Sequence, residues 1–163
     1  MKSLFTFLFL ISFFSTQDLP ELRKQFILAA QSKNSATDFY HKLADAPKDG
    51  NKTLVAYKGA SKALMGKFAS KQADKKSYFV EGVQLIEFAV KSEPKNAEIR
   101  LIRLSIQENT PKVVKYKGNI AEDKEFLLQN YKAQNTALKE FIKNYILQSQ
   151  TFSEAEKTKL LNN

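Results

Sequence analysis

The sequence predicts an all-α protein built from antiparallel helix pairs, and three observations carry this prediction. Apolar residues recur every three or four positions over most of the chain, which is the period of a helix with one buried face. With only 5 Gly and 4 Pro in 163 residues, the chain lacks the turn residues that a sheet protein of this size needs. No stretch alternates polar and apolar residues for long enough to predict a strand.

Side chains that can cap a helix predict several of the helix starts. Asp18 with Glu21, and the first and last residues of 153–156, have the spacing of a capping box. Ser35 and Asp74 are expected to cap the second and fourth helices in the same way. The helices are expected over residues 18–31, 35–43, 52–70, 74–93, 97–108, 120–131, 136–149 and 153 onward.

Proline and glycine predict the breaks between these helices. Pro47 with Gly50 separates the second helix from the third, Pro94 ends the fourth and Pro111 ends the fifth. Residues 112–119 are expected to be irregular.

The third helix carries small residues that would let a neighbouring helix approach closely: Gly59, Ala60, Ala63 and Gly66.

The first 16 residues predict a signal peptide. Lys2 precedes an apolar run over residues 4–14, which is too short for a membrane-spanning helix of about 20 residues. A cut after Ser15 or Thr16 would place a Phe where a small residue is preferred, so an uncleaved N-terminal anchor stays an alternative. Residues 17–163 are expected to form a single all-helical domain in the periplasm or outside the cell.

Spacing in the fourth expected helix resembles a known repeat. A small residue, a bulky one four positions later, a small one after three more and a Pro after five more are present as Gly82, Ile86, Ala89 and Pro94. On these positions, residues 78–108 resemble the tetratricopeptide repeat. Residues 99–123 also resemble exported tetratricopeptide-like proteins of Bacteroidetes-type bacteria. The resemblance implies stacked helix pairs, in a bundle or a short superhelix, and no particular activity.

Composition narrows the possible functions. Without Cys, the chain has no disulfide, thiolate metal site, thiol nucleophile or lipid anchor at a Cys, and with His41 as its single histidine a His-based metal site is not expected. The formal charge is +9, carried almost entirely by lysines spread along the chain. Such lysines predict a solvated surface, and binding to an anionic partner is the alternative.

Two arginines in an apolar helix are the leading candidate site. Arg100 and Arg103 lie three residues apart, so they share a helix face among apolar neighbours and need acceptors. Glu122, Asp123 or carbonyl groups freed at Pro111 could supply these acceptors. The arginines could then clamp an anion or a peptide carboxylate, or they could fasten the following loop to the helices.

Three further residues could line the same site, since binding residues often lie in irregular segments such as 112–119. These residues are Tyr116, Asn119 and Asp123.

Catalytic patterns are not evident. Asp38 with His41 would need a third, orienting group and a pocket, and Glu81 with Glu87 has the placement of solvent-exposed helix residues. The sequence has no phosphate-binding glycine loop, no metal-ligand spacing and no Gly-x-Ser-x-Gly. An enzyme, a cofactor and a bound metal are therefore not expected.

The sequence thus predicts an exported, non-catalytic helical module that binds a protein or peptide. The alternative is a binder of anionic ligands, namely acidic polysaccharide, nucleic acid or anionic lipid, through the lysine-rich surface.

Overall fold

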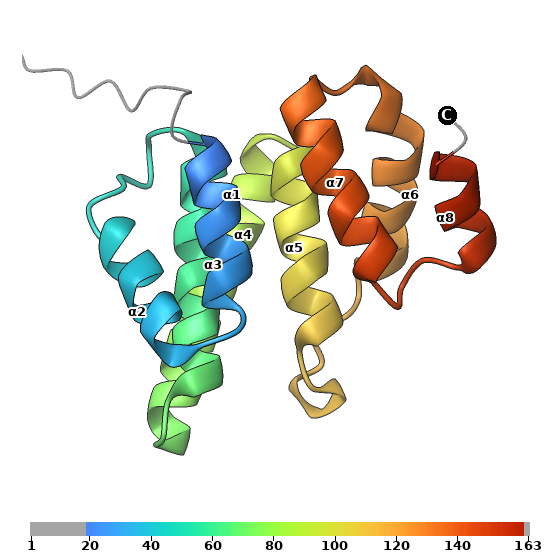
Figure 1. Ribbon diagram of the computed structural model, residues 1–163. Coiled ribbons are helices and arrows are strands. Elements are labelled where there is room, and N and C mark those ends of the chain that lie inside the picture. Colours follow the sequence, from blue (N-terminus) through green and yellow to red (C-terminus); the bar gives the residue numbers. More distant parts are fainter. Residues whose placement is uncertain (1–18, 162–163) are drawn as a thin grey trace, which may run out of the picture.

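The protein is all-α, as the sequence predicts. The structure is a computed structural model that describes residues 19–161, and no strand occurs in that part of the chain (Figure 1). Its elements are α1 (Leu19–Ala29), α2 (Lys33–Lys42), α3 (Lys52–Phe68), α4 (Gln72–Ser92), α5 (Ala97–Asn109), the 3₁₀ turn η2 (Lys112–Val114), α6 (Ile120–Asn130), the 3₁₀ turn η3 (Tyr131–Ala133), α7 (Thr136–Gln148) and α8 (Glu154–Leu161). The expected signal segment 1–16 and the expected cap Asp18 lie outside the described residues.

Two of the predicted caps are wrong. Ser32, not Ser35, caps α2, because its side-chain oxygen accepts the backbone N–H of Ser35 at 3.1 Å. Two serines three residues apart fit the same pattern, and the earlier one is used. Helix α4 begins before Asp74. Asp74 lies in its first turn, where a negative charge interacts favourably with the helix dipole. The capping box at 153–156 is confirmed, since Ser153 donates its N–H to Glu156 at 2.8 Å and accepts the N–H of Glu156 at 3.3 Å.

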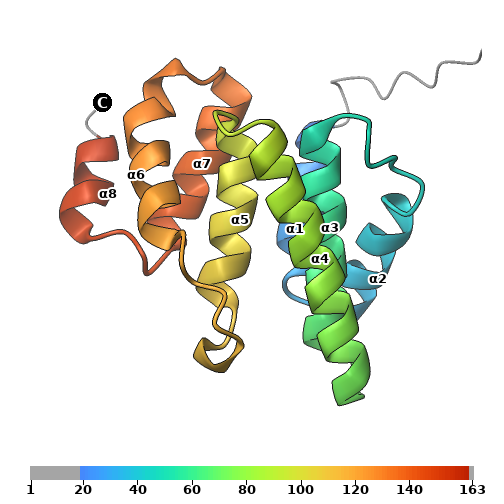
Figure 2. The same cartoon turned by 180° about the vertical axis from the view of Figure 1, so that it is seen from behind.

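Helix α5 lies at the centre of the fold. Helices α1 to α4 lie on one side of it and α6 to α8 on the other, in both views (Figures 1 and 2). It contacts α3, α4, α6 and α7, and ten of its thirteen residues are buried. Its polar side chains therefore need partners inside the protein.

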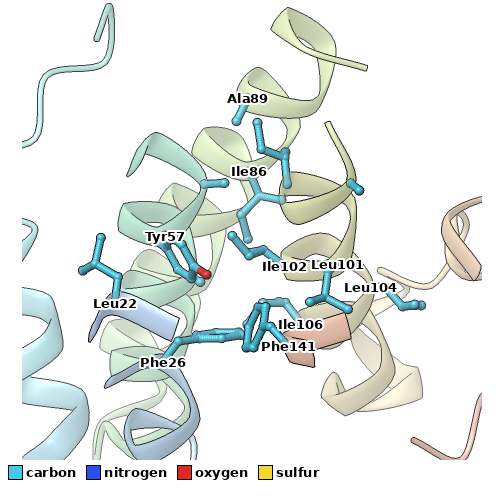
Figure 3. Packing of buried hydrophobic residues seen from close by; sticks show 14 of the residues in the cluster. Leu22, Phe26, Tyr57, Ile86, Ala89, Leu101, Ile102, Leu104, Ile106 and Phe141 are labelled. Atoms are coloured by element: carbon cyan, nitrogen blue, oxygen red, sulfur yellow. The ribbon is translucent and has the colours of Figure 1, made fainter. Parts of the chain in front are cut away.

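The apolar core is packed around this central helix (Figure 3). Side chains from five helices meet there: Leu22, Phe26, Tyr57, Ile86, Ala89, Leu101, Ile102, Leu104, Ile106 and Phe141. Among residues 19–161, no helix is long and apolar enough to cross a bilayer.

Helices α3 and α4 pack at very short range. A Cβ added to Gly59 would lie 2.6 Å from the carbonyl oxygen of Gly82, and one added to Gly82 would lie 2.5 Å from that of Gly59. The prediction that small residues allow a close helix approach is confirmed here, with α4 as the neighbour. The finer prediction of a tetratricopeptide arrangement stays a prediction.

Candidate functional site

Asp123 lies between the two predicted arginines. The Nε and Nη2 atoms of Arg103 donate to the two carboxylate oxygens of Asp123, both at 2.7 Å, and Nη1 of Arg100 donates to one of them at 2.9 Å. The Asp123 side chain is 0 % exposed. A single carboxylate from α6 therefore holds two guanidinium groups from α5.

Glutamates complete the shell around these arginines. Arg100 donates to Glu122 at 2.6 Å, and Arg103 donates to Glu87 at 3.1 Å. The Nε atom of Arg100 donates to the carbonyl oxygen of Pro94 at 2.8 Å. Of the three alternative acceptors considered from the sequence, Glu122 and Asp123 are used, and the backbone acceptor is Pro94 rather than a carbonyl at Pro111. Two positive and three negative charges meet here.

The two remaining predicted residues join the same network. Tyr116 donates its hydroxyl to Glu87 at 2.6 Å, and its ring packs edge-on against Phe79 at 5.8 Å between centroids. Asn119 donates to Glu122 at 3.1 Å. All five predicted site residues are thus brought together, and the network fastens the segment after α5 to α4 and α6. We call these five residues with Glu87 and Glu122 the loop network.

The electrostatics follow from these contacts. The hydrogen bonds from Arg100 and then Asn119 lower the pKa of Glu122. Burial, and then the hydrogen bond to Glu87, raises the pKa of the Tyr116 hydroxyl. The fork of Arg103 that could hold a ligand carboxylate is occupied by Asp123.

A second buried ion pair was missed by the sequence reasoning. The Nε and Nη2 atoms of Arg23 donate to the two oxygens of Glu98 at 2.9 and 2.7 Å, and the Tyr57 hydroxyl donates to Glu98 at 2.7 Å. These three residues, the closed triad, join α1, α5 and α3. Burial, and then the charge of Glu98, raises the pKa of Tyr57 well above its ordinary value. The available signal was Arg23 beside Leu22 on the apolar face of a helix.

A third carboxylate organises the turn after α7. Glu108 accepts hydrogen bonds from the hydroxyls of Tyr145 and Ser149 and from the backbone N–H groups of Gln150 and Thr151. Burial alone would raise the pKa of Glu108, but these hydrogen bonds outweigh it, and the pKa lies below the ordinary value. The carboxylate is therefore held ionised by the turn that it organises.

Beside Glu108, a cleft of about 450 Å³ opens between α1, α5 and α7. Phe26, Leu101 and Phe141 are buried at its lining, and Ile27 is 46 % exposed. The polar lining consists largely of amide and hydroxyl side chains: Gln31, Ser105, Asn109, Asn144, Tyr145, Gln148, Ser149 and Gln150. No Lys or Arg lines the cleft. The sequence reasoning missed this site because its walls are far apart along the chain.

The other residues considered from the sequence are not gathered into a site. Asp38 and His41 are exposed on α2, and the His41 ring contacts that of Tyr40 at 5.7 Å. Within residues 19–161, no three His, Cys, Asp or Glu side chains are placed to hold a metal ion.

The fold and these sites define an all-α protein whose central helix is held by buried carboxylates. Comparison of the chain with protein-family models, with curated proteins and with solved structures gave no match.

Proposed function

We propose that the chain is an exported, non-catalytic module that binds a protein or peptide segment in the cleft between α1, α5 and α7. The observation that carries the proposal is the lining of this cleft, where buried apolar side chains lie beside uncharged polar ones. Its volume of about 450 Å³ suits a few side chains of an inserted segment, in the usual range of ligand pockets.

The amide groups favour a peptide over a charged ligand. An Asn or Gln side chain offers both donors and an acceptor, as a peptide backbone does. Gln31, Gln148 and Gln150 make no side-chain hydrogen bond within residues 19–161, so these groups are available to a partner. The single ionic side chain of the lining, Glu108, is already engaged by the turn after α7. The expected occupant is therefore an uncharged segment with an apolar side chain.

Two neighbouring residues of α1 provide a matched test. Ile27 lines the cleft, whereas Leu28 has almost the same exposure, 43 % against 46 %, and does not line it. We would select peptides from a random phage library on the chain from Gln17 and measure their affinities by fluorescence anisotropy. Ile27→Asp is expected to raise Kd about tenfold or more, and Leu28→Asp to leave it unchanged.

Salt provides the second readout. With no Lys or Arg in the cleft, Kd should stay flat between low and physiological salt. Failure to enrich any peptide, or equal effects of the two substitutions, would overturn the proposal.

A second candidate function is binding of an anionic ligand: acidic polysaccharide, nucleic acid or anionic lipid. Lysines that have no partner favour it. Five exposed lysines make no side-chain hydrogen bond or ion pair within residues 19–161: Lys71, Lys75, Lys76, Lys112 and Lys115. The first lies in the α3–α4 turn, the next two at the start of α4 and the last two in the segment after α5. By contrast, Lys58 and Lys62, which line a second cleft, are engaged by carbonyl oxygens and by Glu81.

A further inference from the structure

One end of the molecule combines exposed lysines with exposed apolar side chains. The turn between α3 and α4 and the segment between α5 and α6 both project at this end, in both views (Figures 1 and 2). The second of these segments contains η2, with the sequence Lys112-Val113-Val114-Lys115. Val113 is 84 % exposed and Val114 is 43 % exposed.

Contacts of the neighbouring residues keep the two valines exposed. Tyr116 lies two residues after Val114, and it is fixed to α4 by its hydrogen bond to Glu87 and its ring contact with Phe79. Lys117 donates to the carbonyl oxygen of Glu108 at 2.9 Å, which fastens the same segment to the end of α5. The valine pair is thus presented outward by a segment that is anchored on both α4 and α5.

The charged residues of the two projecting ends are mostly lysines. No acidic residue occurs between Glu108 and Glu122, and none between Asp49 and Asp74. The α3–α4 turn with the start of α4, and the segment after α5, contribute the five unpartnered lysines, and Asp74 at the start of α4 is the single acidic residue between Asp49 and Glu81. Lysines near an anionic bilayer each favour binding about fivefold, since each contributes about 1 kcal/mol.

We infer that this end of the molecule docks on an anionic lipid bilayer, with Val113 and Val114 entering the interface and the lysines facing lipid phosphates. The inference names the ligand of the second candidate function and rests on it, and it is independent of the peptide cleft. Lipid is favoured over nucleic acid and acidic polysaccharide by the valines, because burial of apolar side chains is what a bilayer interface adds to charge attraction. A lysine also keeps its charge in water while its stem lies along an apolar surface.

The test is co-sedimentation with vesicles. We would use the chain from Gln17, because it contains every residue of the described core and lacks the apolar run at 4–14, which would bind vesicles by itself. Circular dichroism would confirm its fold and that of each variant. Binding to phosphatidylglycerol vesicles is expected, and it should fall steeply with salt. Binding to phosphatidylcholine vesicles should be weak.

Paired substitutions separate the two contributions. Val113→Ser/Val114→Ser and Lys112→Glu/Lys115→Glu are each expected to lower the partition coefficient about tenfold or more. Two matched controls should leave it within about twofold of wild type. They are Leu28→Ser/Leu147→Ser, exposed apolar residues of α1 and α7 that do not line the cleft, and Lys95→Glu/Lys132→Glu, exposed lysines in the α4–α5 turn and in η3 at the opposite end.

Three results would overturn the inference. One is no binding to phosphatidylglycerol, and another is equal loss in the control pairs. The third is binding to a duplex DNA oligonucleotide, without binding to vesicles, that Lys112→Glu/Lys115→Glu weakens and Val113→Ser/Val114→Ser does not. That last result would retain an anionic ligand as the function while rejecting lipid.

Discussion

The two buried ionic clusters of this protein are built in different ways. The closed triad has one positive and one negative charge, and its ionic side chains are 9 % and 5 % exposed. The loop network has two positive and three negative charges, and it extends from the fully buried Asp123 to Glu122, whose side chain is 55 % exposed. One cluster is neutral and enclosed, and the other has a net charge and reaches solvent.

The difference corresponds to what each cluster connects. The triad joins three regular helices, which also share apolar contacts through Phe26, Tyr57 and Leu101. The loop network holds an irregular segment that has few buried side chains of its own. We therefore expect the triad to be replaceable by apolar residues, whereas the loop network defines the course of the segment that carries Val113.

The largest effect should come from the centre of the loop network. Asp123→Asn keeps the shape of the side chain but leaves two buried guanidinium groups without their shared charge, at an expected cost of about 3–5 kcal/mol in the free energy of unfolding. Urea unfolding followed by circular dichroism measures this. Glu122→Gln, at the exposed end, should cost about 1 kcal/mol or less. Equal losses of stability in the two variants would show that burial does not determine how much each carboxylate contributes.

The triad offers the next largest effect and the sharpest contrast. Glu98→Gln leaves Arg23 buried without a counter-charge and is expected to cost about 3 kcal/mol. Replacing the whole triad by Arg23→Met/Tyr57→Phe/Glu98→Leu should recover stability to within about 2 kcal/mol of wild type, since no charge is then left unpaired.

The matching replacement Arg100→Met/Arg103→Met/Asp123→Leu should not recover stability. Glu87 and Glu122 would lose their cationic partners, and the Glu87 carboxylate that accepts the Tyr116 hydroxyl would lose the hydrogen bond from Arg103. Recovery in both triples would remove the distinction between the clusters.

Sequence reasoning found one cluster and missed the other for a physical reason. Arg100 and Arg103 stand out because both lie in a short helix whose other positions are largely apolar. Their partners Glu122 and Asp123 lie in the next helix along the chain, 22 and 20 residues away. Arg23 and Glu98 are 75 residues apart, so nothing local in the sequence indicates that they pair, although Arg23 lies on the apolar face of its helix.

The fold class and the cleft also show that sequence patterns predict local structure but not sites formed by distant segments. Helical periodicity is local, so it predicted the all-α class and the approximate extent of each helix. The cleft is formed by α1, α5 and α7 together, and its residues Ile27 and Asn144 carry no pattern of their own. The choice between Ser32 and Ser35 as a cap depended on a single hydrogen bond that spacing does not specify.

Alkaline pH should affect both clusters through their tyrosines. The pKa of Tyr57 and that of Tyr116 are raised in the folded protein, so the folded state keeps these protons while the unfolded state loses them above about pH 10. Their contribution to stability is complete below pH 10 and is lost as the pH rises, by about 1.4 kcal/mol per tyrosine one unit above it. Tyr57→Phe and Tyr116→Phe should each flatten this fall in the urea midpoint. An unchanged pH slope in either variant would contradict the raised pKa of that hydroxyl.

The smallest effect is expected at the edge of the loop network. Gln107 is 0 % exposed, yet its Nε2 atom lies 3.4 Å from the oxygen of Asn119 and its Oε1 atom has no hydrogen-bond partner among the described residues. The contact is longer than an ordinary hydrogen bond, so Gln107→Leu removes a poorly satisfied polar group. The free energy of unfolding should change by no more than about 1 kcal/mol, and in the stabilising direction.

Gln107→Glu is the counterpart, since it places a charge at the same buried position and should destabilise by more than the leucine does. A loss above about 2 kcal/mol in Gln107→Leu would show that the amide belongs to the network. The loop network would then extend from its carboxylates along α5 toward Glu108, and the polar groups of the central helix would act as one connected set rather than as separate clusters.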